Sequence, residues 1–243
     1  YGSQHSDISA DAIVCRHTLE HIQDVSGLLA LMRAHAERNP GCVVMIEVPD
    51  ATRLWVDGAF EDIYYEHCSY FTPGSLARAL RRAGFAVTDL RREYGDQYLV
   101  VEATLDQNAN RFFDIEETVS DLEPTISGFA EGIPGKLDAW RDFLGDTGSN
   151  GKVAVWGSGS KCVSFLRTLN AVEKINMIID INPHRSGRFA PGVPVSISMP
   201  DDCRQVEPGL MIVMNAVYEN EIRSDLARMG LSPRIESLGR IPQ

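Results

Sequence analysis

Apolar runs and helical patterns alternate along the chain, and this alternation occurs twice. The first series has an apolar run at 11–15, a helical pattern at 24–38 and a β-branched run at 42–48. The second series begins with a strand pattern at 152–156, which an amphipathic stretch at 160–172 follows. Strands that alternate with helices usually pair in parallel sheets. The sequence therefore predicts an α/β fold with two such units.

Further elements complete each series. The first continues with a helix at 74–83 and a pair of strands at 87–94 and 98–105. The second continues with strands at 175–181, 211–215 and 234–238 and a helix at 219–229. Residues 106–147 are acidic and moderately periodic, which indicates one or two linking helices, and 146–151 is typical of a linker. We expect domain boundaries at 1–105, 106–150 and 151–243.

Charge and cysteine content narrow the class of partner and the compartment. The chain has 243 residues and a formal net charge of −11. Non-specific binding to nucleic acid or membranes needs a basic surface, so we expect a small-molecule substrate and neither of those partners. The cysteines are odd in number and widely spaced, which favours free thiols in a cytoplasmic protein. They are Cys15, Cys42, Cys68, Cys162 and Cys203.

The first candidate site follows the strand predicted at 11–15. The segment Arg16–His21 contains His17, Glu20 and His21, and ligands bind beyond the carboxyl ends of strands in open α/β sheets. Because His17 and His21 are four residues apart, they could share a helical face and bind a metal. No other ligand cluster is evident, so we expect no metal site. Capping or packing by the histidines is the plainer alternative.

The second candidate site is Tyr64-Tyr65-Glu66-His67, in an insertion rich in aromatic and acidic residues. So many rings are unusual in an exposed loop and suit a pocket wall. Histidine titrates near neutral pH and can remove a proton from a carbon beside a ketone. A carboxylate can orient the ring, and a tyrosine hydroxyl can stabilise an enolate oxygen. The alternative is that His67 caps or packs against the next helix.

The third candidate site is the turn Gly157-Ser158-Gly159, between a predicted strand and helix. Such a turn can present N–H groups to a phosphate. Asp180 ends the next strand about 20 residues on, as in dinucleotide-binding folds. Cys162 occupies the third glycine position of that motif, which weakens this interpretation.

These motifs together resemble a known family. "DAIVCRHTLEHIQDV" resembles the fourth strand of a class I methyltransferase and the segment after it, and "EDIYYEHCSYFT" resembles the C-3′-methyltransferases that act on keto-deoxysugars linked to thymidine diphosphate. "VAVWGSGSKCVSFL", "IIDINPHRSGRFAPGVPV" and "MIVMNAVYENEI" resemble the C-terminal domain of the same sugar C-methyltransferases. The resemblance implies a truncated class I methyltransferase domain followed by a second Rossmann-like domain. It implies S-adenosylmethionine as cofactor.

The resemblance also implies roles for individual residues. His67 would be the general base, with Glu66 and Tyr64 in support and His21 at the same pocket. His17 and Glu20 would border the cofactor. The family's glycine-rich cofactor loop would precede Asp11, where only ten residues remain, so we expect a fragment that is inactive alone. Residues expected to bind a nucleotide sugar are Gly157, Gly159, Lys161, Asn182, Arg185, Asn215 and Tyr218.

The candidate substrate-binding residues near the C-terminus also have purely structural interpretations, and two other functions remain open. Each basic residue is alternatively a solvated surface group, Asn215 a helix cap and Tyr218 a packing residue. The chain is alternatively an NAD(P)-dependent oxidoreductase that uses Gly157, Gly159 and Asp180, in which case NADH would quench Trp156 fluorescence. It is otherwise a non-catalytic module that binds nucleotide sugars.

Overall fold

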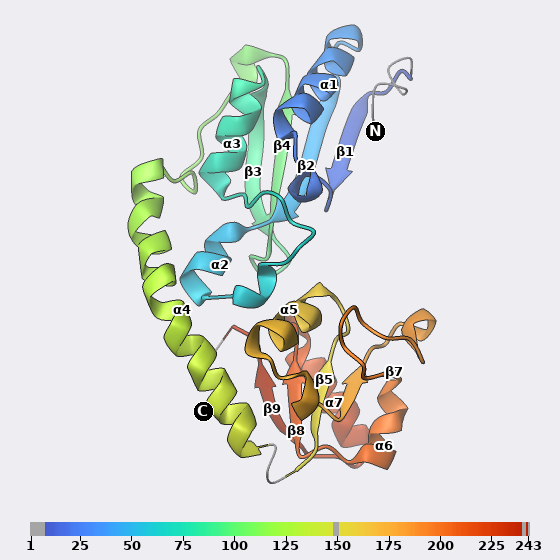
Figure 1. Cartoon of the computed structure of the whole chain (residues 1–243). Helices are drawn as coiled ribbons and strands as arrows, with labels where there is room; N and C mark the ends of the chain where they lie inside the picture. Colours follow the sequence, from blue (N-terminus) through green and yellow to red (C-terminus); the bar gives the residue numbers. More distant parts are fainter. Residues whose placement is uncertain (1–7, 148–150, 240–241, 243) are drawn as a thin grey trace. The chain divides into compact units, whose positions relative to one another are not determined.

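A computed structural model (Figure 1) describes residues 8–147, 151–239 and 242. The chain forms two compact units. The first contains the described residues up to Trp55 together with Tyr65–Ser127, and the second contains Val56–Tyr64 and the described residues from Gly128 onward. Residues 148–150 of the expected linker lie outside the described residues. The boundaries 1–105, 106–150 and 151–243 remain a prediction.

The first unit is built on a four-stranded sheet of order β1-β2-β4-β3. Its strands are β1 (Ala12–Arg16), β2 (Val43–Pro49), β3 (Ala86–Glu93) and β4 (Tyr98–Thr104). β1 and β2 are parallel, whereas β4 runs antiparallel to both of its neighbours. The parallel pairing expected from alternating strands and helices is present between β1 and β2. β3 and β4 form a hairpin around the tight turn at Gly95, and such a turn can join only antiparallel strands.

Two helices and the sheet share one apolar core in this unit. The helices are α1 (Val25–Arg38) and α3 (Pro73–Arg82). Leu29 of α1 and Leu76 of α3 are almost fully buried in the same cluster as Val44 and Ile46 of β2. The Asp24 side chain accepts a hydrogen bond from Gly27 N and caps α1. This packing holds the segments that follow β1 and β2 in fixed positions.

Strand β1 lies at the edge of this sheet and pairs only with β2 among the described residues. Its side chains alternate between the two faces, as the two-residue period of a strand requires. Ile13 and Cys15 are buried, whereas Val14 is 59% exposed. One apolar side chain of the edge strand therefore faces solvent.

The second unit is built on a five-stranded, wholly parallel sheet of order β7-β6-β5-β8-β9. Its strands are β5 (Val153–Trp156), β6 (Met177–Ile179), β7 (Ile197–Ser198), β8 (Leu210–Val213) and β9 (Arg234–Ser237). Its main helices are α5 (Ser160–Leu169), α6 (Cys203–Val206) and α7 (Glu219–Arg228). The order reverses on either side of β5, as in Rossmann-like folds. The predicted α/β fold with a second Rossmann-like unit is confirmed.

Each face of the second sheet has its own core. Val155 of β5 packs in a cluster with Phe165 of α5 and Trp140. Its neighbour Trp156 packs in the other cluster, with Ile222 of α7. Successive strand residues point to opposite faces, so helices cover both sides of the sheet. A strand covered on both faces reads as a continuous apolar run, which is how β5 appears in the sequence.

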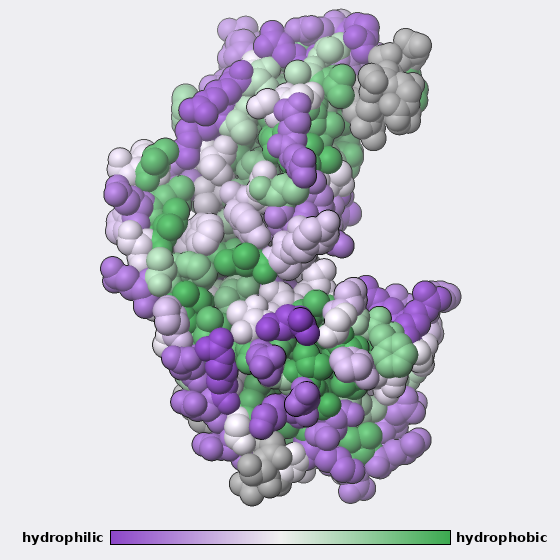
Figure 2. Space-filling model, in the orientation of Figure 1, coloured by the Kyte–Doolittle hydropathy of each residue, from purple (hydrophilic) through white to green (hydrophobic). Residues whose placement is uncertain are grey.

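A single long helix, α4 (Val119–Thr147), follows the first sheet in sequence, where one or two helices were expected. Residues 119–127 belong to the first unit and the rest to the second. None of the helices in the described part of the chain combines the length and hydropathy needed to span a bilayer. Hydrophilic residues are spread over both units on the face that Figure 2 shows.

Candidate active site

Two segments that lie far apart in the sequence are hydrogen-bonded together in the first unit. One is the short 3₁₀ turn Leu19–His21, directly after β1, and the other is the loop Tyr65–Tyr70. The Glu20 carbonyl oxygen accepts hydrogen bonds from Cys68 N (2.7 Å) and from Ser69 N (3.1 Å). The first and second motifs therefore meet, as was expected for His21 and His67.

A side-chain bond adds to this connection and fixes one tautomer. His21 Nδ1 lies 2.8 Å from the main-chain oxygen of Glu66. A carbonyl oxygen can only accept, so Nδ1 carries the proton and donates. In the neutral ring, Nε2 is then unprotonated and can act as an acceptor. The fold thus presents a defined lone pair at His21 Nε2.

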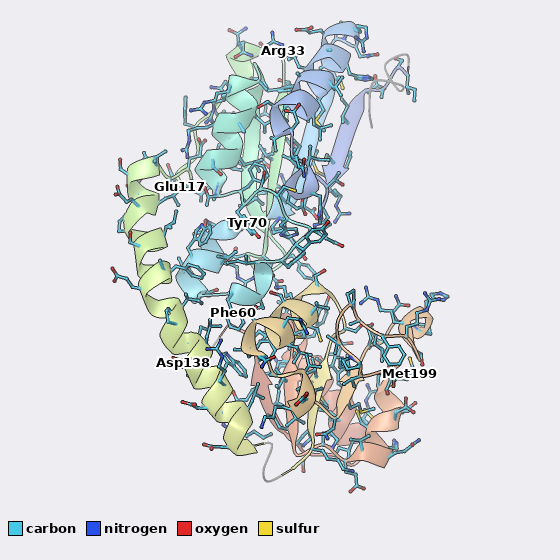
Figure 3. All side chains as sticks on the ribbon, viewed as in Figure 1. Arg33, Phe60, Tyr70, Glu117, Asp138 and Met199 are labelled. Atoms are coloured by element: carbon cyan, nitrogen blue, oxygen red, sulfur yellow. The ribbon has the colours of Figure 1, made fainter. Side chains whose placement is uncertain are left out.

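His67 lies beside this imidazole. The centroids of the His21 and His67 rings are 4.9 Å apart at an interplanar angle of 75°. Tyr70, which Figure 3 labels, is a second aromatic neighbour, with its ring centroid 6.0 Å from that of His67. His67 is half-buried and does not cap α3, which begins after Thr72. The ring is thus held among aromatic neighbours but is not sealed from solvent.

Glu20 supplies a buried carboxylate next to the two histidines. The residue is 2% exposed, and its Oε1 lies 4.0 Å from His21 Nε2. Its Oε2 has no hydrogen-bond partner among the described residues. Burial raises the pKa of Glu20, because a charged carboxylate loses its hydration there. A buried carboxylate oxygen without a hydrogen-bond partner is costly, so Oε2 points to a ligand-binding or catalytic role.

The other two residues of the second motif are placed differently. The Glu66 side chain is exposed, and the residue contacts His21 through its main chain. Tyr64 is half-buried and belongs to the second unit. In that unit the neighbouring Phe60, labelled in Figure 3, stacks on Phe165 with ring centroids 5.9 Å apart.

His17 forms a separate contact with β2. Its Nε2 lies 2.8 Å from Glu47 Oε1, and Arg16 also pairs with Glu47, at 2.9 Å. The His17 ring meets Tyr98 edge-on, with centroids 4.7 Å apart. Sequence reasoning missed Glu47; its only signal was a single carboxylate within the apolar run 42–48. The structure does not bring His17 together with His21 on one helical face, since the 3₁₀ turn begins only at Leu19.

The glycine turn of the second unit packs closely against Met214, the residue directly after β8. Gly157 has a φ of +109°, and a Cβ there would lie 3.0 Å from Met214 Cβ. Only glycine suits this backbone conformation at such a close approach. Cys162, at the position of the third glycine of the dinucleotide motif, is fully buried, and burial raises its pKa to about 12. This thiol is a packing group.

Asp180 accepts a hydrogen bond from a main-chain N–H of the glycine turn, a group that could otherwise bind a phosphate. Its Oδ2 accepts from Ser158 N at 3.1 Å, from the Ser158 hydroxyl and from Arg185 Nη1 at 3.2 Å. Burial disfavours the charge of Asp180, but these bonds together lower its pKa. The carboxylate is thus engaged within the protein and is not free for a ribose, which counts against a nicotinamide dinucleotide here.

The remaining predicted substrate residues lie near the carboxyl ends of the strands. The Lys161 ammonium is 2.9 Å from Asp62, and Gly159 is the N-cap of α5. Asn182 and Asn215 each accept a main-chain N–H two residues ahead, at 3.0 and 3.2 Å. Asn215 is therefore a cap, as its plainer interpretation held.

A cavity of about 270 Å³ opens in the second unit at the carboxyl ends of β5 and β8. Its lining is mostly apolar and includes three of the predicted residues, Gly157, Asn215 and Tyr218. It also includes three carboxylates, Asp180, Glu221 and Asp225. Crevices at this point of a parallel sheet are where Rossmann-like folds bind ligands. The acidic lining disfavours a phosphate inside the cavity itself.

Comparison with known protein families gives the class to which the two α/β units belong. Residues 3–90 match the model of a methyltransferase domain. Residues 101–231, more than half of the chain, match the model of a C-methyltransferase C-terminal domain. The chain therefore belongs to the sugar C-methyltransferase family, and the resemblance seen in the sequence is confirmed.

Other comparisons add little to this conclusion. A search of curated proteins found no match. Among solved structures, the chain is similar to L-tryptophan dehydrogenase from Nostoc punctiforme, with 16% identity and a TM-score of 0.25. That match covers 91% of this chain and 68% of the dehydrogenase chain. So low a score supports no argument about function.

Proposed function

We propose that this chain takes part in the S-adenosylmethionine-dependent C-methylation of a keto sugar linked to a nucleotide. The observation that carries the proposal is the junction of the two motifs in the first unit. Main-chain bonds from Cys68 and Ser69 to Glu20, with the His21–Glu66 bond, hold two imidazoles side by side. A pair of oriented imidazoles suits proton removal beside a ketone.

In this proposal His67 is the general base. It accepts the proton from the carbon next to the sugar ketone, and the electron pair of that C–H bond moves into an enolate. His21 supports His67 through its adjacent ring, and Tyr64 supports the enolate oxygen. Glu66 supports the base by fixing His21 through its main-chain oxygen, rather than by the carboxylate contact expected from the sequence.

Two residues of the first unit offer groups that could border a cofactor. Glu20 Oε2 is a buried acceptor without a partner among the described residues, and His17 is partly exposed at the end of β1. We propose that His17 and Glu20 line this border. S-adenosylmethionine, when bound, supplies the methyl group that the carbon nucleophile takes.

The second unit would hold the nucleotide sugar. Gly159, Lys161, Asn182 and Arg185 are proposed to face the diphosphate, and the two cations would then share their charge between a carboxylate and the phosphates. Gly157, Asn215 and Tyr218 line the mostly apolar cavity, which suits a ring and not a phosphate.

The first test isolates proton removal, which needs no cofactor. The chain is mixed with a thymidine-diphosphate-linked keto sugar in D₂O, and exchange of the hydrogen next to the ketone is followed by NMR. We expect exchange with the parent chain, none with His67→Ala, and normal exchange with His184→Ala, a surface histidine in the second unit. Exchange that survives in His67→Ala shows that the base is wrongly assigned.

The second test measures methyl transfer. It uses the protein, labelled S-adenosylmethionine and the same sugar. His67→Ala is expected to abolish turnover while leaving the affinity for the sugar nucleotide nearly unchanged. Absence of methylation for every nucleotide-linked keto sugar would show that the substrate class is wrong.

A further inference from the structure

Two electron-pair donors lie close to each other in the first unit. With the proton on Nδ1, His21 Nε2 offers a lone pair, and the carboxylate oxygen Oε1 of Glu20 lies 4.0 Å away. This distance is too long for a hydrogen bond. Two acceptors that face one another need a cation or a donor between them.

His67 adds a third potential ligand atom close to those of Glu20 and His21. Glu20, His21 and His67 each offer one ligand atom, and the three atoms lie within 4.8 Å of one another. Ligands of a tetrahedral zinc ion lie about 3.4 Å apart, since the bonds are about 2.0–2.2 Å long. The three side chains would each need to move by less than about 1 Å, which small side-chain rotations supply. The geometry is thus close to a metal site.

The surroundings are those of an oriented metal ligand. A histidine that binds a metal through one nitrogen normally donates its other N–H to a carbonyl or carboxylate, which fixes the ring. His21 does this with the main chain of Glu66. Glu20 is 2% exposed and keeps one oxygen without a partner among the described residues. A buried carboxylate of this kind is stabilised by coordination to a metal.

We propose that Glu20, His21 and His67 form a binding site for a divalent transition-metal ion of the Zn²⁺ or Co²⁺ type, and that the ion competes with proton uptake by His67. Two imidazoles and one carboxylate suit these borderline ions better than Mg²⁺ or Ca²⁺, which prefer oxygen alone. Three protein ligands leave a coordination position open. The binding itself is independent of the proposed function, whereas the competition rests on His67 being the base.

The test of binding uses the purified chain without a histidine tag. Zn²⁺ is titrated calorimetrically against the chain, and Co²⁺ binding is followed by its visible absorption. We expect one ion per chain, with binding that weakens as pH falls, because the ligands must be deprotonated. Glu20→Gln, His21→Ala and His67→Ala should each weaken Zn²⁺ binding by more than about tenfold, the low end of the loss caused by removing even an outer partner.

Two variants serve as controls. His184→Ala removes an exposed histidine of the second unit and should bind Zn²⁺ as the parent does. Cys68→Ser removes the exposed thiol next to His67 and should also leave binding intact. Absence of one-to-one binding, or binding that is lost only in Cys68→Ser, would overturn the site. Circular dichroism of each variant shows that lost binding does not reflect unfolding.

The competition has its own readout. In the D₂O exchange assay, saturating Zn²⁺ should stop exchange, and a chelator should restore it. Zn²⁺ that binds to the three residues and leaves exchange unchanged would disprove the competition, although the site would stand. A chain that binds Zn²⁺ but exchanges no proton in metal-free buffer would instead refute the proposed function alone.

Discussion

His21 Nδ1 donates a hydrogen bond to the main-chain oxygen of Glu66, 45 residues further along the chain, at 2.8 Å. This bond sets the tautomer of His21 and helps to hold the loop that carries His67. The identity of residue 66 matters little to the bond, because the acceptor is main chain. The residue at 21, in contrast, must present a donor where Nδ1 lies.

The His21–Glu66 bond can be tested with two amides. The Asn side chain can place its NH₂ near the position of Nδ1, whereas Gln places it closer to Nε2. His21→Asn should therefore keep the loop anchored, and His21→Gln should loosen it. Hydrogen exchange at the amides of Cys68 and Ser69 measures the anchoring, with faster exchange expected only in the Gln variant. Equal exchange in both variants would mean that the bond does not hold the loop.

Glycine is predicted to be required at position 157 but not at position 135. Gly157→Ala should destabilise the second unit by about 1–3 kcal/mol, because φ is +109° and the new Cβ would press on Met214. Gly135 lies within α4 with open space around its Cα, so Gly135→Ala should stabilise by about 0.5–1 kcal/mol. Denaturant unfolding followed by Trp140 fluorescence measures both changes. A stabilising Gly157→Ala would contradict the packing described for the turn.

Asp180 is predicted to stabilise the glycine turn and not to bind a ribose. Asp180→Ala removes the acceptor of Ser158 N–H, the Ser158 hydroxyl and Arg185, and should cost about 2 kcal/mol of unfolding free energy. Asp138→Ala breaks an exposed pair with Arg141 and should cost less than about 0.5 kcal/mol. NADH added to the unmodified chain should leave Trp156 fluorescence unchanged. Saturable quenching by NADH would revive the dinucleotide hypothesis.

Glu61 is predicted to make the second unit less stable as pH rises. Its side chain is buried, and its Oε2 has no partner among the described residues. Burial raises its pKa; Asp62 acts in the same direction, and Lys136 and Lys161 oppose it. The folded state therefore holds the proton more tightly than the unfolded state, whose pKa is about 4.3. Stability contributed by the protonated form is full below that value and is lost as pH rises through the folded pKa.

The measurement for Glu61 compares the parent with Glu61→Gln across a pH series. The difference in unfolding free energy should be small at low pH and should grow in favour of the glutamine variant as pH rises. Trp140, in the same unit, reports unfolding. A difference that is constant with pH would show that Glu61 does not titrate in this range.

The sequence predicts elements well where one residue pattern decides the structure. The Gly95-Asp96 turn, the strand β5 and the helices α1 and α3 all carry strong local signals, and the structure has them. Helix α2 (Ala51–Asp57) was missed, because the segment was interpreted as an insertion. Its signal was Asp50, whose side chain accepts from Thr52 N, as a helix-capping residue does. Strand β7 has two residues, too few for any period to be visible.

The sequence predicted which residue types form the candidate site, but not the hydrogen bonds and ion pairs between them. His21 and His67 were expected at one pocket because of the family resemblance, and the structure places them side by side. The bond through the main chain of Glu66 leaves no trace in the sequence, since every residue has a carbonyl. Glu47 was hidden because its partners lie on another strand, where the register pairs Arg16 with Glu47.

The edge position of β1 has a consequence for handling the protein. A strand that pairs on one side only presents unsatisfied N–H and C=O groups along its other side. Val14, 59% exposed on that strand, adds an apolar side chain to the edge. Such an edge can recruit a strand from another molecule, so sheet extension at β1 is expected to promote aggregation of this chain in concentrated solutions.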